Sequence, residues 1–168
     1  MLQRRSPDAT QHVQDLVADE IPVALHYNGA SFAVQMATPC DLAELALGFS
    51  LSEALIADAG ELRIEDISES LDGIAIRMTI PAARAAALAQ RRHNLPGYGS
   101  CGICGSADVE SVLRAPPRIE SPLRIDEAAL HRALAALHAR QPLNAATGAT
   151  HAAGFAQRDG ALLLVRED

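Results

Sequence analysis

The chain has 168 residues and a mass of 17.7 kDa, which suits one domain of ordinary size or two small ones. About half of its residues are apolar, enough for a buried core, and all 14 basic residues are arginine. The absence of lysine excludes a Walker A lysine and a Schiff base, and the net charge of −7 disfavours broad nucleic-acid binding.

Residues 1–18 have no clear periodicity, and we expect them to be a disordered lead-in. Apolar residues then alternate over 20–27, as they do in a half-buried strand, and again over 31–36. Between these segments, Asn28-Gly29 predicts a type I′ turn, because both central positions of that turn need a positive φ. The first regular structure is therefore expected to be a β-hairpin.

A helix is predicted over residues 39–57, with Thr38 as its N-cap. The two strands and the alanine-rich helix that follow are expected over 62–68, 71–80 and 81–92. The order of hairpin, helix, two strands and helix favours an α+β roll that resembles a β-grasp. We place this N-terminal domain at residues 19–115.

A further helix, over residues 126–140 and capped by Asp126, is predicted in the last part of the chain. Its core stripe is expected to consist of Leu130, Ala133, Leu134 and Leu137. The strand over 161–165 has no polar alternation and should be buried on both faces, yet the chain stops three residues later. We therefore expect residues 118–168 to be an incomplete domain. The alternative is a hairpin that packs on the helix.

Several features favour a cytoplasmic location. No apolar run approaches the ~20 residues that a membrane span requires, so no membrane partner is expected. Residues 1–19 are polar and lack the apolar segment of a secretory signal. Three cysteines are an odd number for a disulfide framework, which favours a reducing compartment.

The most specific feature is the glycine-rich segment 97–105, which contains Cys101 and Cys104. Two thiols three positions apart can point into one site, and the glycines let the backbone approach a ligand closely. Cys104 comes just before a predicted helix N-terminus, whose free N–H groups and dipole stabilise a thiolate. Arg91 and Arg92 precede the loop and add positive potential. The pattern predicts a cysteine that is nucleophilic at neutral pH.

Several chemistries use such a CxxC pair. A closed zinc site needs two further ligands, which Cys40 with a histidine, or a second subunit, would have to supply. A thioredoxin-like redox pair normally opens a long helix directly after a strand, whereas this loop is longer. A zinc deaminase also needs a His-x-Glu motif, which the sequence lacks. Sulfur transfer through a persulfide and two inert cysteines in a tight turn both stay open on these residues alone.

Four blocks of the sequence resemble, in the same order, motifs of the formate dehydrogenase accessory sulfurtransferases, the FdhD/NarQ family. The blocks are residues 20–29, 45–53, 101–105 and 147–153. Four ordered blocks make the resemblance, which covers roughly residues 20–168, more specific than a single CxxC.

The resemblance implies a protein that accepts sulfur from a cysteine desulfurase and passes it to the molybdenum (or tungsten) bis-pterin guanine dinucleotide cofactor of formate dehydrogenase. That cofactor would be a bound substrate, with no permanently bound cofactor or metal. Cys101 matches the family's persulfide-carrying cysteine, and Cys104 matches its partner. The implied fold adds a cytidine-deaminase-like three-layer α/β/α domain, of which this chain, apparently truncated at its C-terminus, would hold only the first part. A homodimer is also compatible with the resemblance.

Some residues outside the CxxC pair have two interpretations each. Arg91 and Arg92 would bind a phosphate of the cofactor, or would simply complement a helix C-terminus. His151 would approach the cysteine loop or the ligand, or would be a satisfied histidine at a strand end. Cys40 is expected to be a small buried hydrophobe. For the whole chain, the alternatives to a sulfurtransferase are a zinc-stapled or partner-binding module without enzymatic activity, and an inactive fragment.

Overall fold

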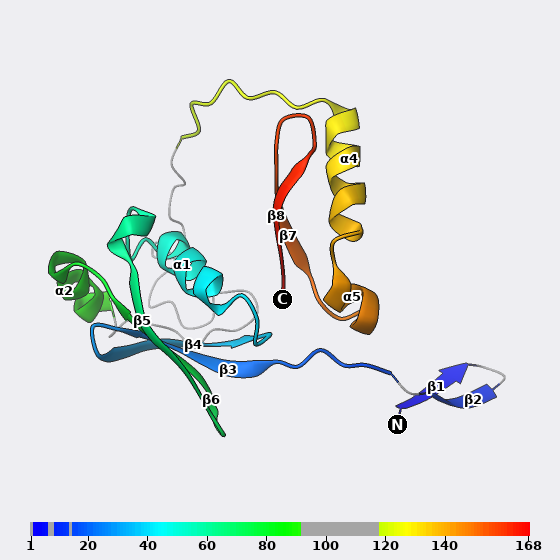
Figure 1. Cartoon of the computed structure of the whole chain (residues 1–168), viewed down its shortest axis with the longest axis horizontal. Coiled ribbons are helices and arrows are strands. Elements are labelled where there is room, and N and C mark those ends of the chain that lie inside the picture. The colour runs from blue at the N-terminus through cyan, green and yellow to red at the C-terminus, as the bar shows by residue number, and fades with distance from the viewer. Residues whose placement is uncertain (1, 7–8, 14, 92–117) are drawn as a thin grey trace. The chain divides into compact units, whose positions relative to one another are not determined.

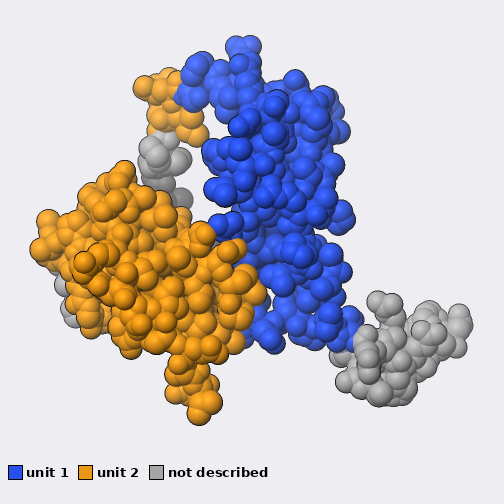
Figure 2. All heavy atoms as spheres, viewed as in Figure 1, with its two compact units in different colours: residues 1–20, 121–168 blue, residues 21–120 orange. Residues whose placement is uncertain are grey.

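The computed structural model describes residues 2–6, 9–13, 15–91 and 118–168. Two compact units can be distinguished, one of residues 1–20 and 121–168 and the other of residues 21–120 (Figure 2). Both combine helices with strands, which confirms the expected α+β class. Among the described residues no helix is long and apolar enough to cross a membrane.

The second unit begins with the expected β-hairpin, made of β3 (Ile21–Tyr27) and β4 (Ala30–Ala37) (Figure 1). Asn28 has a φ of 50° and Gly29 a φ of 80°, so the Asn-Gly turn has the backbone conformation that its sequence predicts. The Asn28 side chain also accepts a hydrogen bond from Ile80 N–H at 2.9 Å and donates one to Ile80 O at 3.0 Å. These two hydrogen bonds connect the turn to Ile80, which is 52 residues away in the sequence.

Four strands form one mixed sheet in the order β4-β3-β6-β5. The hairpin is followed by α1 (Leu42–Ser52), the short 3₁₀ helix η1 (Ala59–Glu61), β5 (Arg63–Ser70), β6 (Gly73–Thr79) and α2 (Ala82–Arg91). The first and last strands, β3 and β6, are central and parallel, and each hairpin adds one antiparallel edge strand. The predicted order of hairpin, helix, two strands and helix is confirmed.

The core of this unit lies on one face of the two central strands. The alternating residues that face it are almost fully buried: Val23, Leu25, Tyr27, Ile74, Ile76 and Met78. Burying each such side chain contributes about 1.5–3 kcal/mol. The buried hydroxyls of Ser50 and Tyr27 are both satisfied, because Ser50 donates to Ala46 O at 2.6 Å and therefore accepts from the Tyr27 hydroxyl at 2.7 Å.

Helix α1 is shorter than the sequence predicts. Its N-cap is Asp41, in a left-handed conformation with φ 48°, and Thr38 is not the cap. The chain first turns at Thr38, whose carbonyl accepts the N–H of Cys40 at 2.7 Å, so the helix cannot begin at residue 39. The helix ends at Ser52 because Ala54 adopts a left-handed φ of 52°, which stops it before the expected residue 57.

The other unit contains a hairpin of β1 (Leu2–Ser6) and β2 (Ala9–Val13) within the segment expected to be a disordered lead-in. Its larger part consists of α4 (Glu127–His138), α5 (Pro142–Thr147) and a second hairpin of β7 (Ala152–Ala156) and β8 (Leu162–Glu167). Asp126 caps α4 as predicted, since its Oδ1 accepts the Ala129 N–H at 2.5 Å.

The predicted burial in this unit is largely wrong. Helix α4 buries Ala129, whereas Leu130 and Leu134 of the expected core stripe are 51% and 55% exposed. On β8, Leu163 and Leu164 are 47% and 56% exposed, although the strand was expected to be buried on both faces. The physical reason is that one helix and a two-stranded sheet are too small to enclose side chains on every apolar surface. Within this unit the β7–β8 hairpin contacts α4 (Figure 1), and whether residues 118–168 are part of a larger domain stays a prediction.

Candidate functional site

The structure describes the framework on both sides of the cysteine loop. Cys101, Cys104 and Arg92 lie outside the described residues. Arg91 is the last residue of α2, and only its backbone is described. The placement of the two thiols and of both arginine side chains therefore stays a prediction.

Helix α2, which leads into the cysteine loop, is firmly attached to the sheet unit. Leu88 is 5% exposed in the core, and Arg84 Nε lies 3.2 Å from Glu61 Oε2 in η1. The pKa of Glu61 is held below its ordinary value, first by the hydrogen bond from the Ala57 N–H at 2.8 Å and further by Arg84. The described part of α2 is therefore fixed to the sheet unit, and the residues that follow it lie outside the described residues.

The segment 147–151, one of the motif-like blocks, is tightly organised by side-chain hydrogen bonds. Gly148 ends α5 with a left-handed φ of 66° and donates its N–H to Asn144 O at 2.7 Å. Thr147 donates its hydroxyl to Leu143 O at 2.8 Å. Thr150 is 7% exposed, and its hydroxyl lies 3.4 Å from Glu167 Oε1. This segment therefore has one set conformation in its unit.

Glu167 is the residue that holds this arrangement, and the sequence analysis missed it. Its carboxylate is buried and accepts the N–H groups of Leu143 at 3.0 Å and Asn144 at 2.8 Å, at the start of α5. Those N–H groups have no partner within the helix, so the carboxylate caps it from a distant strand. The only signal in the sequence is an acidic residue at the end of an apolar strand.

His151 extends the β7–β8 pairing by one residue. Its N–H donates to Asp168 O at 2.8 Å, and its carbonyl accepts the Asp168 N–H at 3.0 Å, while the residue itself is exposed. The backbone is thus fixed and the imidazole is accessible to a ligand. Whether it approaches the cysteine loop stays a prediction.

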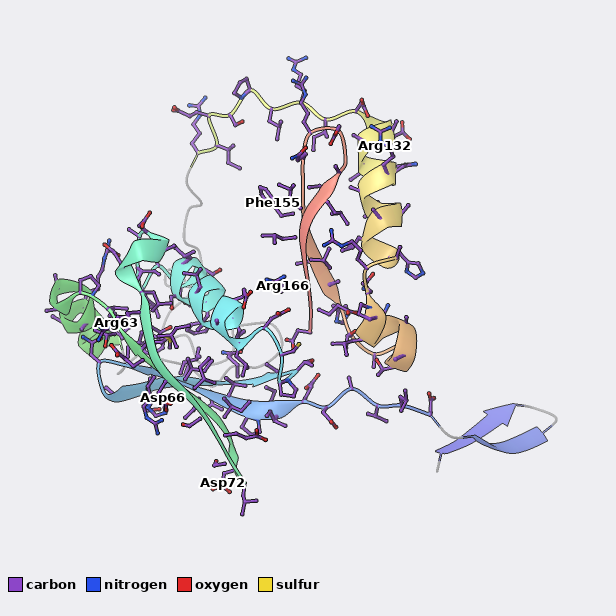
Figure 3. All side chains as sticks on the ribbon, viewed as in Figure 1. Arg63, Asp66, Asp72, Arg132, Phe155 and Arg166 are labelled. Carbon is purple, nitrogen blue, oxygen red and sulfur yellow. The ribbon has the colours of Figure 1, made fainter. Side chains whose placement is uncertain are left out.

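His151 shares one face of the hairpin with Arg166 and Phe155. Ala153 pairs with Arg166 and Phe155 with Leu164, and residues two apart in a strand lie on the same face. Gly154, on the other face, lies against Leu137 of α4. Figure 3 shows Phe155 and Arg166 on the side of the hairpin away from α4. Arg166, half-buried here, is a candidate ligand group that the sequence analysis did not select.

Cys40 is exposed, so its predicted burial is wrong. It lies in the turn between β4 and α1, where none of the described helices and strands buries it. Within the described part of the chain, no three His, Cys, Asp or Glu side chains are grouped as a metal site would require. The zinc interpretation depends on Cys101 and Cys104, which lie outside the described residues, so it stays an untested alternative.

These observations define a mixed α+β protein in which an anchored helix leads into a glycine-framed cysteine pair. The chain belongs to the FdhD/NarQ family, whose family model matches residues 18–168. The resemblance found in the four sequence blocks is thereby confirmed.

Curated relatives are similar to nearly the whole of this chain. This chain is 56% identical over 156 residues to the sulfur carrier protein FdhD of Xanthomonas campestris pv. campestris (strain B100). The aligned region covers 93% of this chain and 56% of that protein. It is also 43% identical over 154 residues to the sulfur carrier protein FdhD of Cupriavidus necator. That alignment covers 92% of this chain and 54% of the relative. The chain spans about half the length of these relatives.

A solved structure has a similar fold. It is a crystal structure of a protein from Desulfotalea psychrophila described as a formate dehydrogenase accessory protein. The TM-score is 0.65 at 21% sequence identity, and the match covers 99% of this chain and 59% of that one. At this level of sequence identity, the similarity between the two structures supports a common fold.

Proposed function

We propose that the chain is a sulfur carrier that takes part in the maturation of formate dehydrogenase. The observation that carries the proposal is the family match over residues 18–168, which includes the pair Cys101 and Cys104 within a glycine-rich segment. The curated relatives bear the name sulfur carrier protein, which supports the same role for this chain.

In the proposed first step, the Cys101 thiolate attacks the outer sulfur of a persulfide on a cysteine desulfurase. A new S–S bond forms at Cys101, the S–S bond of the donor breaks, and the donor cysteine leaves as a thiolate with the electron pair. Cys101 then carries one additional sulfur atom as Cys–S–SH. The positive potential of Arg91 and Arg92 would keep the attacking thiol ionised.

In the proposed second step, Cys104 attacks the inner sulfur of that persulfide. A Cys101–Cys104 disulfide forms and the outer sulfur leaves as hydrosulfide, so the two electrons come from the dithiol. A cellular dithiol then reduces the disulfide. The sulfur acceptor is the molybdenum bis-pterin guanine dinucleotide cofactor, which is bound as a substrate.

The remaining parts of the proposal concern binding and location. Arg91, Arg92 and His151 contact the cofactor, with guanidinium groups on its phosphates. The protein works in the cytoplasm with a cysteine desulfurase and formate dehydrogenase as partners. Its domains are a β-grasp-like roll over 19–115 and the first part of a cytidine-deaminase-like domain over 118–168.

The test is sulfur transfer from cysteine with radiolabelled sulfur, in the presence of a cysteine desulfurase. The chain should retain label that a reducing agent removes, and Cys101→Ala should lose it. Cys40→Ala is the matched control, because Cys40 is an exposed cysteine elsewhere in the chain, and it should be labelled normally. Equal labelling of Cys101→Ala would overturn the assignment. Stoichiometric zinc that resists dialysis would instead favour a zinc-stapled module.

A further inference from the structure

The turn between β5 and β6 presents a leucine to solvent. Ser70 pairs with Gly73 across the hairpin, so Leu71 and Asp72 are the two residues of the turn. Leu71 is fully exposed. The hairpin forms a narrow protrusion of the orange unit in Figure 2, and Asp72 lies at its tip in Figure 3. An apolar side chain at the tip of a protrusion is well placed to enter a pocket on a partner.

Neither the backbone nor the core requires a leucine in this turn. Leu71 and Asp72 both have a negative φ, which most residue types adopt, and polar residues are the usual choice in turns. Because the Leu71 side chain is fully exposed, it adds nothing to the core of its unit. A large apolar side chain in water gains free energy when it is covered. Burial of Leu71 in a partner is therefore a source of binding free energy.

The turn that presents Leu71 has a set conformation. Ser70 Oγ donates a hydrogen bond to Gly73 O at 3.0 Å and accepts one from the Asp72 N–H at 3.3 Å. Gly73 has a φ of 134°, and a Cβ there would lie 2.2 Å from Pro22 O, so the base of the hairpin packs closely against β3. A preorganised turn loses little conformational entropy when it binds.

Next to the turn, the outer face of the sheet is apolar. Gly73 precedes the buried Ile74 and so lies on the face opposite the core, beside Pro22 of β3, which pairs with Met36 of β4. Pro22 is exposed and Met36 is 54% exposed. We call Leu71, Gly73, Pro22 and Met36 the tip surface. It contains no charged residue, and it joins a protruding side chain to a flat apolar area.

Two carboxylates flank Leu71. Glu69 precedes it by two residues and Asp72 follows it directly, and both are exposed. Within the described part of the chain neither forms an ion pair, whereas Glu65 and Asp66, nearer the start of β5, are paired with arginines. Charges at the rim of a contact steer association and select a partner of opposite charge. The tip surface therefore fits an apolar pocket whose rim carries arginine or lysine.

We propose that the tip surface binds the sulfur donor, a cysteine desulfurase, with Leu71 in an apolar pocket that has a basic rim. This inference rests on the proposed function. The donor's sulfur is covalently bound to a protein side chain, so its transfer requires contact between two protein surfaces, whereas the proposed acceptor is a cofactor. A docking surface acts on the affinity between the two proteins and leaves the exchange of bonds at Cys101 unchanged.

The test measures binding and sulfur transfer separately, with the full chain and a cysteine desulfurase of the same organism. Isothermal titration calorimetry without cysteine gives the dissociation constant. Leu71→Gln should raise that constant about tenfold or more, because a leucine is no longer buried. In single-turnover loading of Cys101, the same variant should need more donor for half-maximal rate and should reach the native maximal rate. Its thermal unfolding should match that of the native chain, since Leu71 is fully exposed.

The flanking acids give a second variant. Glu69→Gln with Asp72→Asn keeps the shape of the turn and removes two charges. It should raise the dissociation constant about two- to fivefold at low salt and make binding less dependent on salt concentration. An unchanged salt dependence would contradict the basic rim proposed for the donor.

Leu134→Gln is the matched control, because Leu134 is a 55% exposed leucine on α4, in the other compact unit. It should leave the dissociation constant unchanged. A native chain that does not bind the desulfurase, or Leu71→Gln that binds as tightly as the native chain, would overturn the docking surface. Binding that Leu71→Gln weakens, without loading of Cys101, would support the docking surface and would instead count against the proposed sulfur transfer.

Discussion

The C-terminal end of α1 contains a residue, Ala54, whose substitution should increase the stability of the protein. The N–H of Ala54 bonds Leu51 O at 3.0 Å and the N–H of Leu55 bonds Ser50 O at 2.9 Å, which is the hydrogen-bond pattern of a Schellman motif. The residue at its left-handed position is usually glycine, but here it is Ala54, with a φ of 52°. Ala54 is exposed, so its methyl group contributes little packing.

Ala54→Gly should therefore stabilise the protein. A left-handed conformation costs a residue with a Cβ about 1–2 kcal/mol, and glycine removes that cost. Glycine also increases the conformational entropy of the unfolded chain, which lowers the gain in stability by about 0.4–1 kcal/mol. The net gain should be about 0.5–1 kcal/mol, or roughly 1–4 °C in the midpoint of thermal unfolding for a chain of this length.

The matched control is the same substitution within the same helix. Ala43 is exposed in the first turn of α1 and has an ordinary helical backbone, so Ala43→Gly should destabilise by about 0.5–1 kcal/mol. Thermal unfolding followed by circular dichroism measures both variants. If Ala54→Gly lowers the midpoint as Ala43→Gly does, the reasoning about the left-handed residue is refuted.

Three further predictions concern other parts of the chain. A Cβ at Gly160 would lie 2.2 Å from Ala129 O, so Gly160→Ala should cost about 2 kcal/mol or more in thermal unfolding. Gly148→Ala, with an open environment, should cost only about 1 kcal/mol. Glu167→Ala should cost about 1–3 kcal/mol in urea unfolding, because two N–H groups of α5 lose their acceptor; no loss would contradict the capping role. The pKa of Glu61 is lowered in the folded state, so its stabilisation is present above its ordinary pKa of 4.5 and is lost as pH falls through the folded value. Glu61→Gln should therefore flatten the acid limb of stability against pH, and an unchanged limb would contradict this.

The sheet unit was predictable because its signals are local. Alternation in β3 and the Asn28-Gly29 turn determine the first hairpin within a few residues. The limits of α1 were not predictable, because they depend on the left-handed residues Asp41 and Ala54, which have no Gly or Asn signature.

The C-terminal region was harder to predict because burial is set by neighbouring elements. The stripe of α4 has helical spacing, but Leu130 and Leu134 are buried only if another layer covers them. The role of Glu167 depends on contacts across 23 and 24 residues, which periodicity does not reveal. The cysteine pair was recognised from residue types and spacing alone, and its geometry lies outside the described residues.

The central claim is that Cys101 temporarily carries sulfur. Peptide mapping by mass spectrometry, after incubation with a cysteine desulfurase and cysteine, tests it most directly. We predict one additional sulfur atom on Cys101 and none on Cys40, an exposed cysteine outside the glycine-rich segment. Additional sulfur on Cys40 alone, or on no cysteine of the chain, would contradict the account.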